Sequence, residues 1–483
     1  MKIMFVIPWT KSLYGDEYAT PGHPHVGVAY LTSVLKDEGH DVRIFDQGIE
    51  KDDSKLFHLI DMFKPDVIGI TAFSYCYKYV VALLEGIKEK TSIPVIIGGP
   101  HVSAIKKRVL SDTIADFAMK GESEISFPEF LNELKKEKPQ FENVDGLIWR
   151  NKYKDIVENK DQELIKDLNK LPFPDYEAFN LEKYNYFHKK TLPILTSRGC
   201  PYSCNYCSVR LSMGKAFRPR SPKNVVDELE FWYKKGFDNF EFNDDCFSLK
   251  LDRAKEICKL IIERDLKIKW QLYNGIRADR VDEELLGIMK ESGCIFISYG
   301  CESGDQDIIN NIGKKLPLDK VKSAVIKANK VGIKNSVNFI IGHPGETYEK
   351  AMETLKFAEC LPTTFLNVYN LIPYPGTTLY EWIENNGTWL YSEQEVLEDI
   401  GSRDLKPVFE TPEFTKEERI RALKKGFSLY EKTVMKFRFG KFVGIIAYYF
   451  TRIPYVYKLS RIIALDNKLG NMVYTFITAR SRR

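Results

Sequence analysis

The sequence predicts an α/β protein in three parts: a doubly wound parallel sheet, a second run of β/α units, and a helical carboxyl-terminal region. Two patterns predict this class. Short apolar runs alternate with segments of helical periodicity over the first 140 residues, and the alternation resumes at residue 192. Strands that are apolar on both faces are typical of parallel sheets covered by helices. A chain of 483 residues is too long for one ordinary core, so we expect several domains.

The first domain, residues 1–140, is predicted to hold a doubly wound sheet. Its strands are expected at residues 3–8, 41–46, 67–71, 95–99 and 117–120, and its helices near residues 26–38, 54–63, 78–88 and 123–135. Ligands of such sheets bind beyond the carboxyl ends of the strands. Gly98 and Gly99 lie at that end of the fourth strand, where a residue without a side chain lets a bulky ligand approach the backbone. We therefore predict a ligand site at these glycines.

Residues 141–190 are predicted to form a hairpin, at 144–157, and an extended proline-containing linker, at 167–180. The next domain, residues 191–380, repeats the β/α alternation. Its strands are expected at residues 192–197, 239–243, 269–274, 294–299, 334–341 and 366–372, with helices at 222–234, 253–264, 282–291, 318–330 and 348–360. Six β/α units are too few for a closed eight-stranded barrel.

Three cysteines, Cys200, Cys204 and Cys207, follow the first strand of this second domain with the spacing CxxxCxxC. Thiolates are the usual ligands of iron–sulfur clusters, and three of them leave one iron of a four-iron cubane open. A structural zinc site needs a fourth ligand, and the next cysteine is Cys246. The spacing therefore favours a 4Fe-4S cluster over the alternative, a zinc knuckle.

The cysteine motif, with Tyr206 directly before its last cysteine, resembles that of the radical S-adenosylmethionine enzymes. The resemblance implies that the open iron binds S-adenosylmethionine and that the six units form a partial (β/α)6 barrel, with its chemistry at the carboxyl ends of the strands. It also implies cofactor-binding roles for residues at three strand ends. These are Asp244 and Asp245 for the methionine ammonium, Glu302 and Ser303 for the ribose or the methionine carboxylate, and Gly342 for the adenine. Ordinary helix capping is the alternative for the two aspartates.

The first domain resembles the cobalamin-binding domain that precedes the radical core in class B methylases. The matching landmarks are Pro8, the Gly98-Gly99-Pro100 turn and Gly121-Glu122. The resemblance implies that cobalamin is a cofactor and that Gly98 and Gly99 contact it. Asp-x-His-x-x-Gly, the motif that supplies a histidine to cobalt in other cobalamin folds, is absent, which leaves His23, His25 and His101 as the nearest substitutes. A flavodoxin-like domain that binds nothing is the alternative.

The function implied by the resemblance, which covers roughly residues 1–380, is methyl transfer. A 5′-deoxyadenosyl radical formed at the cluster takes a hydrogen atom from a lipid or small metabolite, and methylcobalamin donates a methyl group to the unactivated centre. A flavodoxin- or ferredoxin-type electron donor is the implied partner. Two alternatives stay open: an oxidative enzyme of the anaerobic magnesium-protoporphyrin cyclase type, and a non-catalytic iron–sulfur redox protein.

The composition bears on the kind of partner and on the cellular compartment. A net charge of +4 gives no reason to expect a nucleic-acid partner, and nine cysteines without a secretory signal indicate the reducing cytoplasm. The dispersed cysteines, Cys246 among them, are expected to be buried small hydrophobes. Arg210, Arg218 and Arg220 could hold an anionic group of a cofactor or substrate, or they could lie on a solvated face or form helix-flanking salt bridges, and these interpretations stay open.

The last part, residues 381–483, is predicted to be helical, with a charged helix at 415–436. Residues 437–450, 455–465 and 479–483 interleave aromatic and aliphatic residues with Lys and Arg, and acidic residues almost vanish. This composition suits an amphipathic helix at an anionic membrane surface, although no stretch reaches the roughly 18 apolar residues of a membrane span. The alternative is a helical cap whose apolar face packs on the barrel.

Overall fold

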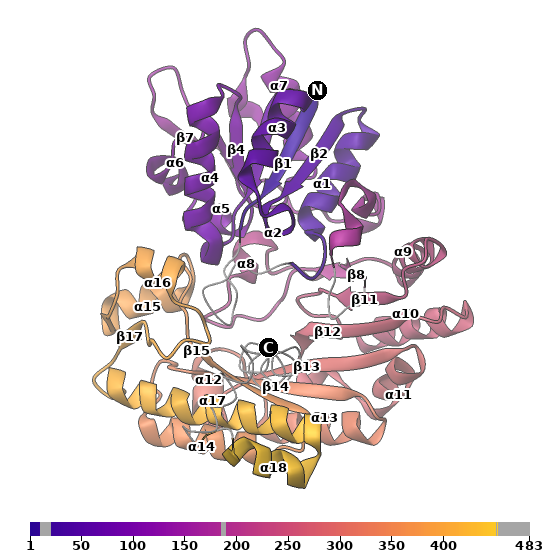
Figure 1. Ribbon diagram of the computed structural model, residues 1–483, viewed down its shortest axis with the longest axis vertical. Coiled ribbons are helices and arrows are strands. Elements are labelled where there is room, and N and C mark those ends of the chain that lie inside the picture. The colour runs from indigo at the N-terminus through magenta and orange to yellow at the C-terminus, as the bar shows by residue number, and fades with distance from the viewer. Residues whose placement is uncertain (10–20, 185–189, 451, 453–483) are drawn as a thin grey trace, which may run out of the picture.

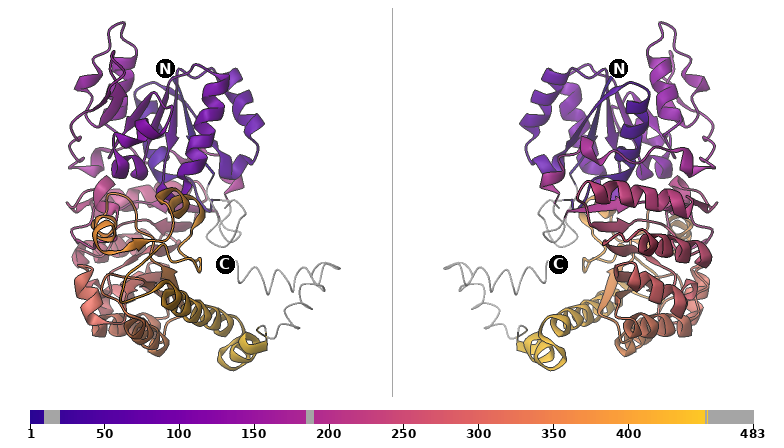
Figure 2. Two further views of the ribbon diagram at one scale, coloured as in Figure 1. Left: turned by 90° about the vertical axis from the view of Figure 1, so that its left-hand side faces the viewer. Right: turned by 90° about the vertical axis from the view of Figure 1, so that its right-hand side faces the viewer.

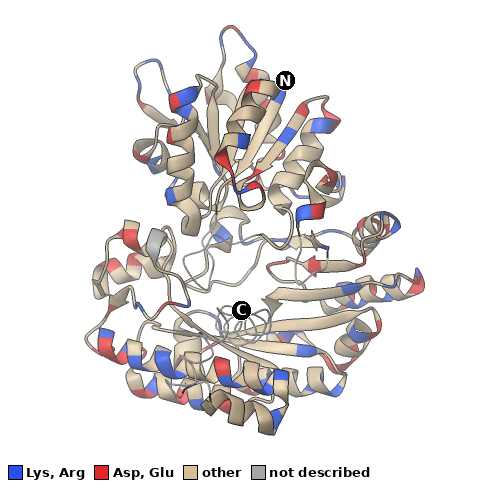
Figure 3. Ribbon diagram, viewed as in Figure 1, with Lys and Arg blue, Asp and Glu red and all other residues tan. Residues whose placement is uncertain are grey.

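The structure is a computed structural model and describes residues 1–9, 21–184, 190–450 and 452. Two sheets, the first mostly and the second wholly parallel, follow each other along the long axis of the molecule, and the last two described helices, α17 and α18, lie at the end remote from the first sheet (Figure 1). Acidic and basic residues are interspersed along the outer helices in Figure 3, so the net charge of +4 is not concentrated on one element of this view.

The first sheet has seven strands in the order β2-β1-β3-β4-β5-β6-β7. Its parallel part confirms the five predicted strands and consists of β1 (Lys2–Ile7), β2 (Asp41–Asp46), β3 (Val67–Thr71), β4 (Val95–Gly98) and β5 (Phe117–Met119). The helices are α1 (Val26–Asp37), α2 (Gln47–Glu50), α3 (Asp53–Phe63), α4 (Tyr77–Lys90), α5 (Pro100–Ile105), α6 (Arg108–Asp112) and α7 (Ser126–Leu134). Along β1, Ile3 and Phe5 belong to one core cluster and Met4 and Val6 to another, so both faces of the sheet are covered.

The predicted hairpin is confirmed as β6 (Leu147–Arg150) and β7 (Ile156–Glu158). It pairs antiparallel with β5 and so extends the first sheet. The division of the chain at residues 140, 190 and 380 stays a prediction, and on this pairing the hairpin goes structurally with the first domain.

The linker joins the two sheets through a buried tyrosine. Tyr176 is completely buried, and its hydroxyl donates to the carbonyl of Pro193, in the first strand of the second sheet, over 2.5 Å. One residue earlier, the amide of Asp175 donates to the carbonyl of Ala29 on α1 over 3.1 Å. The linker thus fastens a helix of the first domain to a strand of the second.

The second sheet confirms the six predicted strands, in the order β15-β14-β13-β12-β11-β8, all of them parallel. The strands are β8 (Thr191–Ile194), β11 (Asn239–Phe242), β12 (Lys269–Ile276), β13 (Cys294–Glu302), β14 (Lys334–Ile341) and β15 (Phe365–Asn370). The helices are α8 (Val209–Ser212), α9 (Pro222–Lys234), α10 (Leu251–Glu263), α11 (Glu283–Glu291), α12 (Gln306–Asn311), α13 (Leu318–Lys330) and α14 (Tyr348–Cys360). Since β8 and β15 do not pair in the described chain, the sheet is an open partial barrel.

Two short ribbons complete the described strands: β9 (Ser197–Arg198) with β10 (Arg218–Pro219), and β16 (Thr388–Trp389) with β17 (Phe409–Glu410). The carboxyl-terminal helices are α15 (Thr378–Asn386), α16 (Glu393–Asp399), α17 (Lys416–Phe439) and α18 (Lys441–Phe450). The predicted charged helix is confirmed as α17, which packs so closely on β15 that a Cβ added at Gly426 would lie 2.5 Å from Val368. Helix α17 therefore packs on the last strand of the partial barrel.

Helix α18 turns back against α17 (Figure 2), and part of its apolar face is exposed. Tyr448 is buried against α17, while Phe442 is 79% and Ile446 68% exposed. No helix among the described residues has both the length and the apolar character to traverse a bilayer. The predicted basic and aromatic stretches at 455–465 and 479–483 lie outside the described residues.

Replacing Tyr176 tests the linker contact. Tyr176→Ala is expected to lower the free energy of unfolding by roughly 3–5 kcal/mol, because it leaves a cavity and removes the bond to Pro193. The control Tyr153→Ala, at a side chain that is 72% exposed, should change it by less than about 0.5 kcal/mol. Denaturant unfolding measures both, and equal effects would contradict the fastening role of the linker.

Candidate active site between the two sheets

The three predicted cluster ligands lie on one loop that is held on several sides. Cys200, Cys204 and Cys207 are free and partly exposed. Main-chain bonds tie the loop to distant segments: the Asn205 amide donates to the carbonyl of Ile312 over 2.9 Å. Gly199 has a φ of +82°, and a Cβ there would lie 2.3 Å from the carbonyl oxygen of Ala216. The loop is therefore fixed by close backbone approaches as well as by hydrogen bonds.

The donor set fits a cluster better than a single ion. Among the described residues, no three His, Cys, Asp or Glu side chains are placed to hold one metal ion together. A cubane spreads its ligands, because each thiolate binds a different iron. Three thiols on one loop suit that arrangement.

Cys246 is buried, as expected from the sequence, and it lies beside Cys200, one of the three predicted ligands. Against the effect of burial, the Cys246 thiol lowers the pKa of Cys200 to about 7. The contact joins residues far apart in the sequence, and no local pattern marks it.

The structure separates the two aspartates that the sequence paired. Asp244 is completely buried, and its carboxylate accepts bonds from the Thr196 amide (2.6 Å) and from the Thr196 and Ser197 hydroxyls (2.5 Å each). It braces the chain between β8 and the cysteine loop. Asp245 accepts a bond from the Gly199 amide over 3.1 Å and lines the large cavity described below. Burial raises the pKa of Asp245 to about 6.

Glu302, at the end of β13, faces the cysteine loop. Its carboxylate lies 2.7 Å from the ammonium of Lys314, and both side chains are 9% exposed. Together with burial, its charge raises the pKa values of Tyr206 and Cys204 on that loop. Its φ is +76°, a left-handed conformation that is rare for a residue with a side chain and that concentrates at functional sites. The predicted neighbour Ser303 instead pairs with the Thr354 hydroxyl over 3.0 Å, away from the loop.

Gly342, at the end of β14, begins a turn that also approaches the cysteine loop. Its φ is +115°, and a Cβ there would lie 2.6 Å from the guanidinium of Arg419. The next residue, His343, is 1% exposed and stands 5.8 Å from the Tyr206 ring, and neither ring nitrogen has a hydrogen-bond partner in the described chain. A buried imidazole without partners is a polar group left for a ligand or for water. Burial lowers the pKa of His343 to about 3, so the ring is neutral.

A cavity of about 350 Å³ opens between the carboxyl ends of the two sheets. The first domain contributes Gly98 and Gly99, and the second contributes Asn243, Asp245 and Asn274. A Cβ at Gly98 would meet only the Met119 carbonyl, at 3.7 Å, so its absence leaves room on the cavity side. Gly99 has a φ of +103°, and a Cβ there would lie 2.8 Å from the Ala72 carbonyl. The glycines therefore form a cradle whose wall is backbone.

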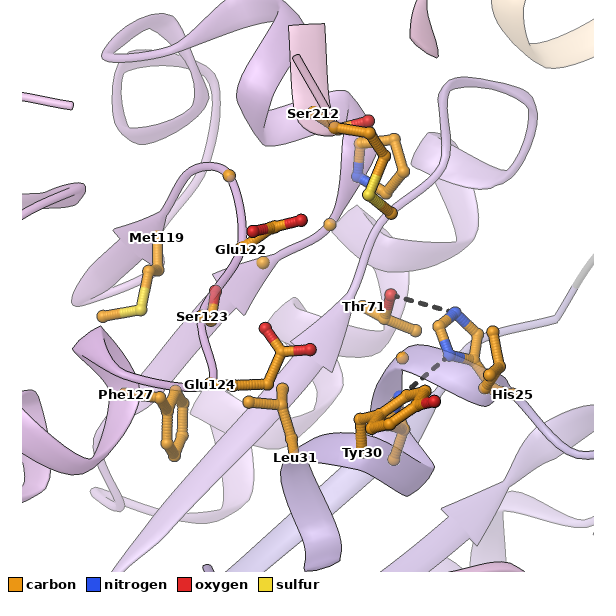
Figure 4. A pocket seen from close by; sticks show the side chains of 18 of the residues that line it. His25, Tyr30, Leu31, Thr71, Met119, Glu122, Ser123, Glu124, Phe127 and Ser212 are labelled. Carbon is orange, nitrogen blue, oxygen red and sulfur yellow. Dashed lines mark hydrogen bonds between the residues drawn. The ribbon is translucent and has the colours of Figure 1, made fainter. Parts of the chain in front are cut away.

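Four charged side chains form ion pairs that link the two domains at this cavity. Glu122 and Glu124 follow β5, and both carboxylates lie at the cavity wall in Figure 4. Arg218 forms a bidentate pair with Glu122 at 2.6 and 2.7 Å, and Arg198 lies 2.5 Å from Glu124. Burial opposes ionisation of Glu122, but the two arginines outweigh it and hold the pKa of that carboxyl below its ordinary value. Of the interpretations of Arg218, the structure supports the salt bridge, and neither a solvated face nor a free anion site.

The histidines named as cobalt ligands are placed differently. His25 lines the cavity and caps α1, because its Nδ1 accepts from the Val28 amide over 3.1 Å, and its Nε2 lies 3.5 Å from the Thr71 hydroxyl (Figure 4). Burial lowers its pKa to about 4. His101 packs on the Tyr77 ring at 4.1 Å and does not line the cavity.

Both domains that form this site match known protein families. Residues 194–358 match the radical SAM superfamily, and residues 13–131 match the B12 binding domain. An uncharacterized methyltransferase of Pyrococcus horikoshii is 32% identical over 434 residues, 88% of this chain and 92% of that protein. The cytidylyl-2-hydroxyethylphosphonate methyltransferase of Streptomyces wedmorensis is 28% identical, over 78% of this chain and 80% of its own.

Two further comparisons concern a cyclase and the fold. The anaerobic magnesium-protoporphyrin IX monomethyl ester cyclase of Rubrivivax gelatinosus is 27% identical, over 79% of this chain and 70% of its own. Among solved structures, the radical S-adenosylmethionine methyltransferase TsrM of Kitasatospora setae, with cobalamin and a 4Fe-4S cluster, has a TM-score of 0.67 at 19% identity, covering 80% of this chain and 74% of that one. The cobalamin-dependent radical enzyme OxsB has a TM-score of 0.70 at 16% identity, covering 99% and 74%. These structures share the fold.

The matches confirm the resemblance inferred from the cysteine motif and the Gly98-Gly99 turn. They also confirm three cofactors: a 4Fe-4S cluster, S-adenosylmethionine and cobalamin. Which residues hold each cofactor stays a prediction, supported by the loop and cavity described above. The chain belongs to the radical S-adenosylmethionine enzymes that carry an amino-terminal cobalamin-binding domain.

Proposed function

We propose that the protein is a methyltransferase that acts on a small-molecule substrate inside the partial barrel. The observation that carries this proposal is the cavity between the sheets: its walls include the glycine cradle of the first domain and, from the second, Asn243, Asp245 and Asn274. A group carried by cobalamin there would face the radical core directly. The methyltransferases among the relatives support the same assignment.

The residues of the chain provide binding and orientation. When bound, the cluster supplies an electron, S-adenosylmethionine supplies the radical chemistry, and cobalamin supplies the methyl group. Cys200, Cys204 and Cys207 hold the cluster and leave one iron without a protein ligand. Asp245 and Glu302, at the edge of the loop, accept hydrogen bonds from S-adenosylmethionine, whose amino group and ribose are donors. Asp244 acts indirectly, because its hydrogen bonds hold Thr196 and Ser197 in position.

Apolar residues of the cavity exclude water around the reacting groups. Phe5, Phe127 and Leu195 belong to its lining, and each is less than 10% exposed. A dry site protects reactive species from side reactions with solvent. This arrangement suits radical chemistry, which needs little acid–base machinery.

An oxidative cyclase is the second candidate, because the Rubrivivax gelatinosus cyclase aligns over most of this chain. The electron donor of flavodoxin or ferredoxin type also stays a proposal. So does a peripheral membrane contact through the carboxyl-terminal region, for which the exposed Phe442 and Ile446 of α18 are the described residues available. Such a membrane contact would favour a lipid substrate.

Product analysis separates the two candidates. The anaerobically reconstituted protein, incubated with reductant, S-adenosylmethionine and a metabolite extract, is expected to form S-adenosylhomocysteine together with 5′-deoxyadenosine, because methyl transfer consumes the methyl group of the cofactor. Chromatography with mass detection measures both. Formation of 5′-deoxyadenosine with no S-adenosylhomocysteine and no methylated product would favour the cyclase class instead.

Single serine substitutions test the cluster ligands. Cys200→Ser, Cys204→Ser and Cys207→Ser should each remove most of the iron and sulfide, because a cubane held by three thiolates loses a third of its protein ligands. The matched control is Cys360→Ser, an exposed cysteine on α14. Iron and sulfide per chain are the readouts, and full occupancy in any of the three variants would remove that residue from the ligand set.

Filling the glycine cradle tests the cobalamin site. Gly98→Leu should reduce bound cobalt at least about tenfold, because the new side chain occupies the cavity wall, while the iron content stays unchanged. In the control Gly287→Leu, on α11, an added Cβ meets nothing within 4 Å. Metal analysis after reconstitution reports both values, and normal cobalt in Gly98→Leu would place cobalamin elsewhere.

A further inference from the structure

Glu241 lies on the inner face of the second sheet. It is in the middle of β11, in register with Pro193 on β8 and Gln271 on β12. Its neighbours Phe240 and Phe242 are completely buried in the core beneath the helices. Because side chains alternate along a strand, Glu241 points to the opposite side, into the partial barrel.

In the described part of the chain, Glu241 has no hydrogen-bond or ion-pair partner, and His23 is the group whose charge acts on it. Glu241 is only 7% exposed. Other buried acids do have partners: Glu122 pairs with Arg218, Glu228 with Arg220 and Glu302 with Lys314. Burial raises the pKa of Glu241, and the charge of His23 partly offsets this. A buried polar group without a partner is costly, so its retention calls for a ligand.

The position of Glu241 places it just below the cofactor cavity. Asn243, two residues further on the same face, lines that cavity. Two residues of a strand span about 6.6 Å, so Glu241 stands one layer deeper in the barrel. A substrate between cobalamin and the barrel floor would reach it.

The rest of the inner face is neutral or already paired. On the neighbouring strands, the Asn338 amide donates to the Ser298 hydroxyl and the Asn367 amide donates to Asn338, both over 2.9 Å. Below them, the Phe296 ring lies 4.8 Å from Tyr273 and 6.3 Å from Phe365. The Arg403 guanidinium, which donates to Asn367 over 3.0 Å and to the Tyr369 hydroxyl over 3.3 Å, is a cation with partners of its own. In its described part the barrel therefore offers flat apolar surfaces, hydrogen-bonding groups that already have partners, and in Glu241 one carboxylate without a hydrogen-bond or ion-pair partner.

We propose that Glu241 binds a protonated amino group of the substrate, so that the substrate class is small ammonium compounds with a flat apolar portion. The inference rests on the proposed function only in placing the substrate inside the barrel. A charge-assisted hydrogen bond from an ammonium supplies the donor that Glu241 lacks, together with a positive charge in direct contact. The aromatic layer accommodates the apolar portion.

Equilibrium dialysis of the holoprotein, loaded anaerobically with cluster and cobalamin, tests this assignment. The probes are benzylammonium, benzyl alcohol and benzoate, which share one ring and differ in charge. The wild-type protein is expected to bind benzylammonium at least about tenfold more tightly than benzoate, and Glu241→Gln to weaken benzylammonium about tenfold while changing benzyl alcohol less than about twofold. Equal affinity for benzylammonium and benzoate, or an unchanged Glu241→Gln variant, would overturn the proposal.

Controls separate this role from cofactor binding and from folding. Glu230→Gln, at a side chain 29% exposed on the outer helix α9, should leave all three affinities unchanged. Glu241→Gln should keep its iron, its cobalt, its affinity for S-adenosylmethionine and its melting temperature, because Glu241 has no partner in the described chain to lose. A loss of S-adenosylmethionine binding would assign Glu241 to the cofactor and overturn the substrate role. Since binding requires no turnover, a failed methyl-transfer assay would leave this result intact.

Discussion

The buried ion pairs between the domains are the constraint on which the site depends. Glu122 and Glu124 follow the last parallel strand of the first sheet, while Arg198 and Arg218 lie on either side of the cysteine loop. All four residues are less than 8% exposed, so removing one partner would leave an uncompensated buried charge at a cost of about 3–5 kcal/mol. Because the arginines belong to the short β9–β10 ribbon that brackets the loop, the pairs fix the cysteines relative to the cavity.

The arrangement explains how two sheets that each place ligands at their strand ends can serve one reaction. The carboxyl ends of both sheets point toward the same cavity, and the buried Tyr176 of the linker holds the domains at that spacing. On the cavity side the first domain contributes backbone through Gly98 and Gly99. The second contributes side chains at the ends of β11 and β12. Bulky cofactors can thus approach the protein closely on one side and meet polar groups on the other.

The elements and the cluster motif could be predicted because their signals are local: apolar runs mark the strands, and the three cysteines lie within eight residues. The partners of the long-range contacts could not be predicted from the sequence. Arg218 and Glu122 are 96 residues apart, and the proximity of Cys246 to Cys200 likewise depends on the completed fold. Asp244 and Asp245 look equivalent in sequence, yet only the packing of Thr196 and Ser197 assigns the first to bracing. Glu241 has no local signal, since what distinguishes it is a missing partner.

The most direct test of the central claim, that the cavity between the sheets is the cobalamin site facing the cluster, is an anaerobic crystal structure of the chain reconstituted with iron, sulfide and hydroxocobalamin. The predicted result is corrin density against Gly98 and Gly99, with a cluster on Cys200, Cys204 and Cys207 across the cavity and the Glu122–Arg218 pair intact. Corrin density elsewhere in a protein with one cobalt per chain, or a cluster on other residues, would contradict it.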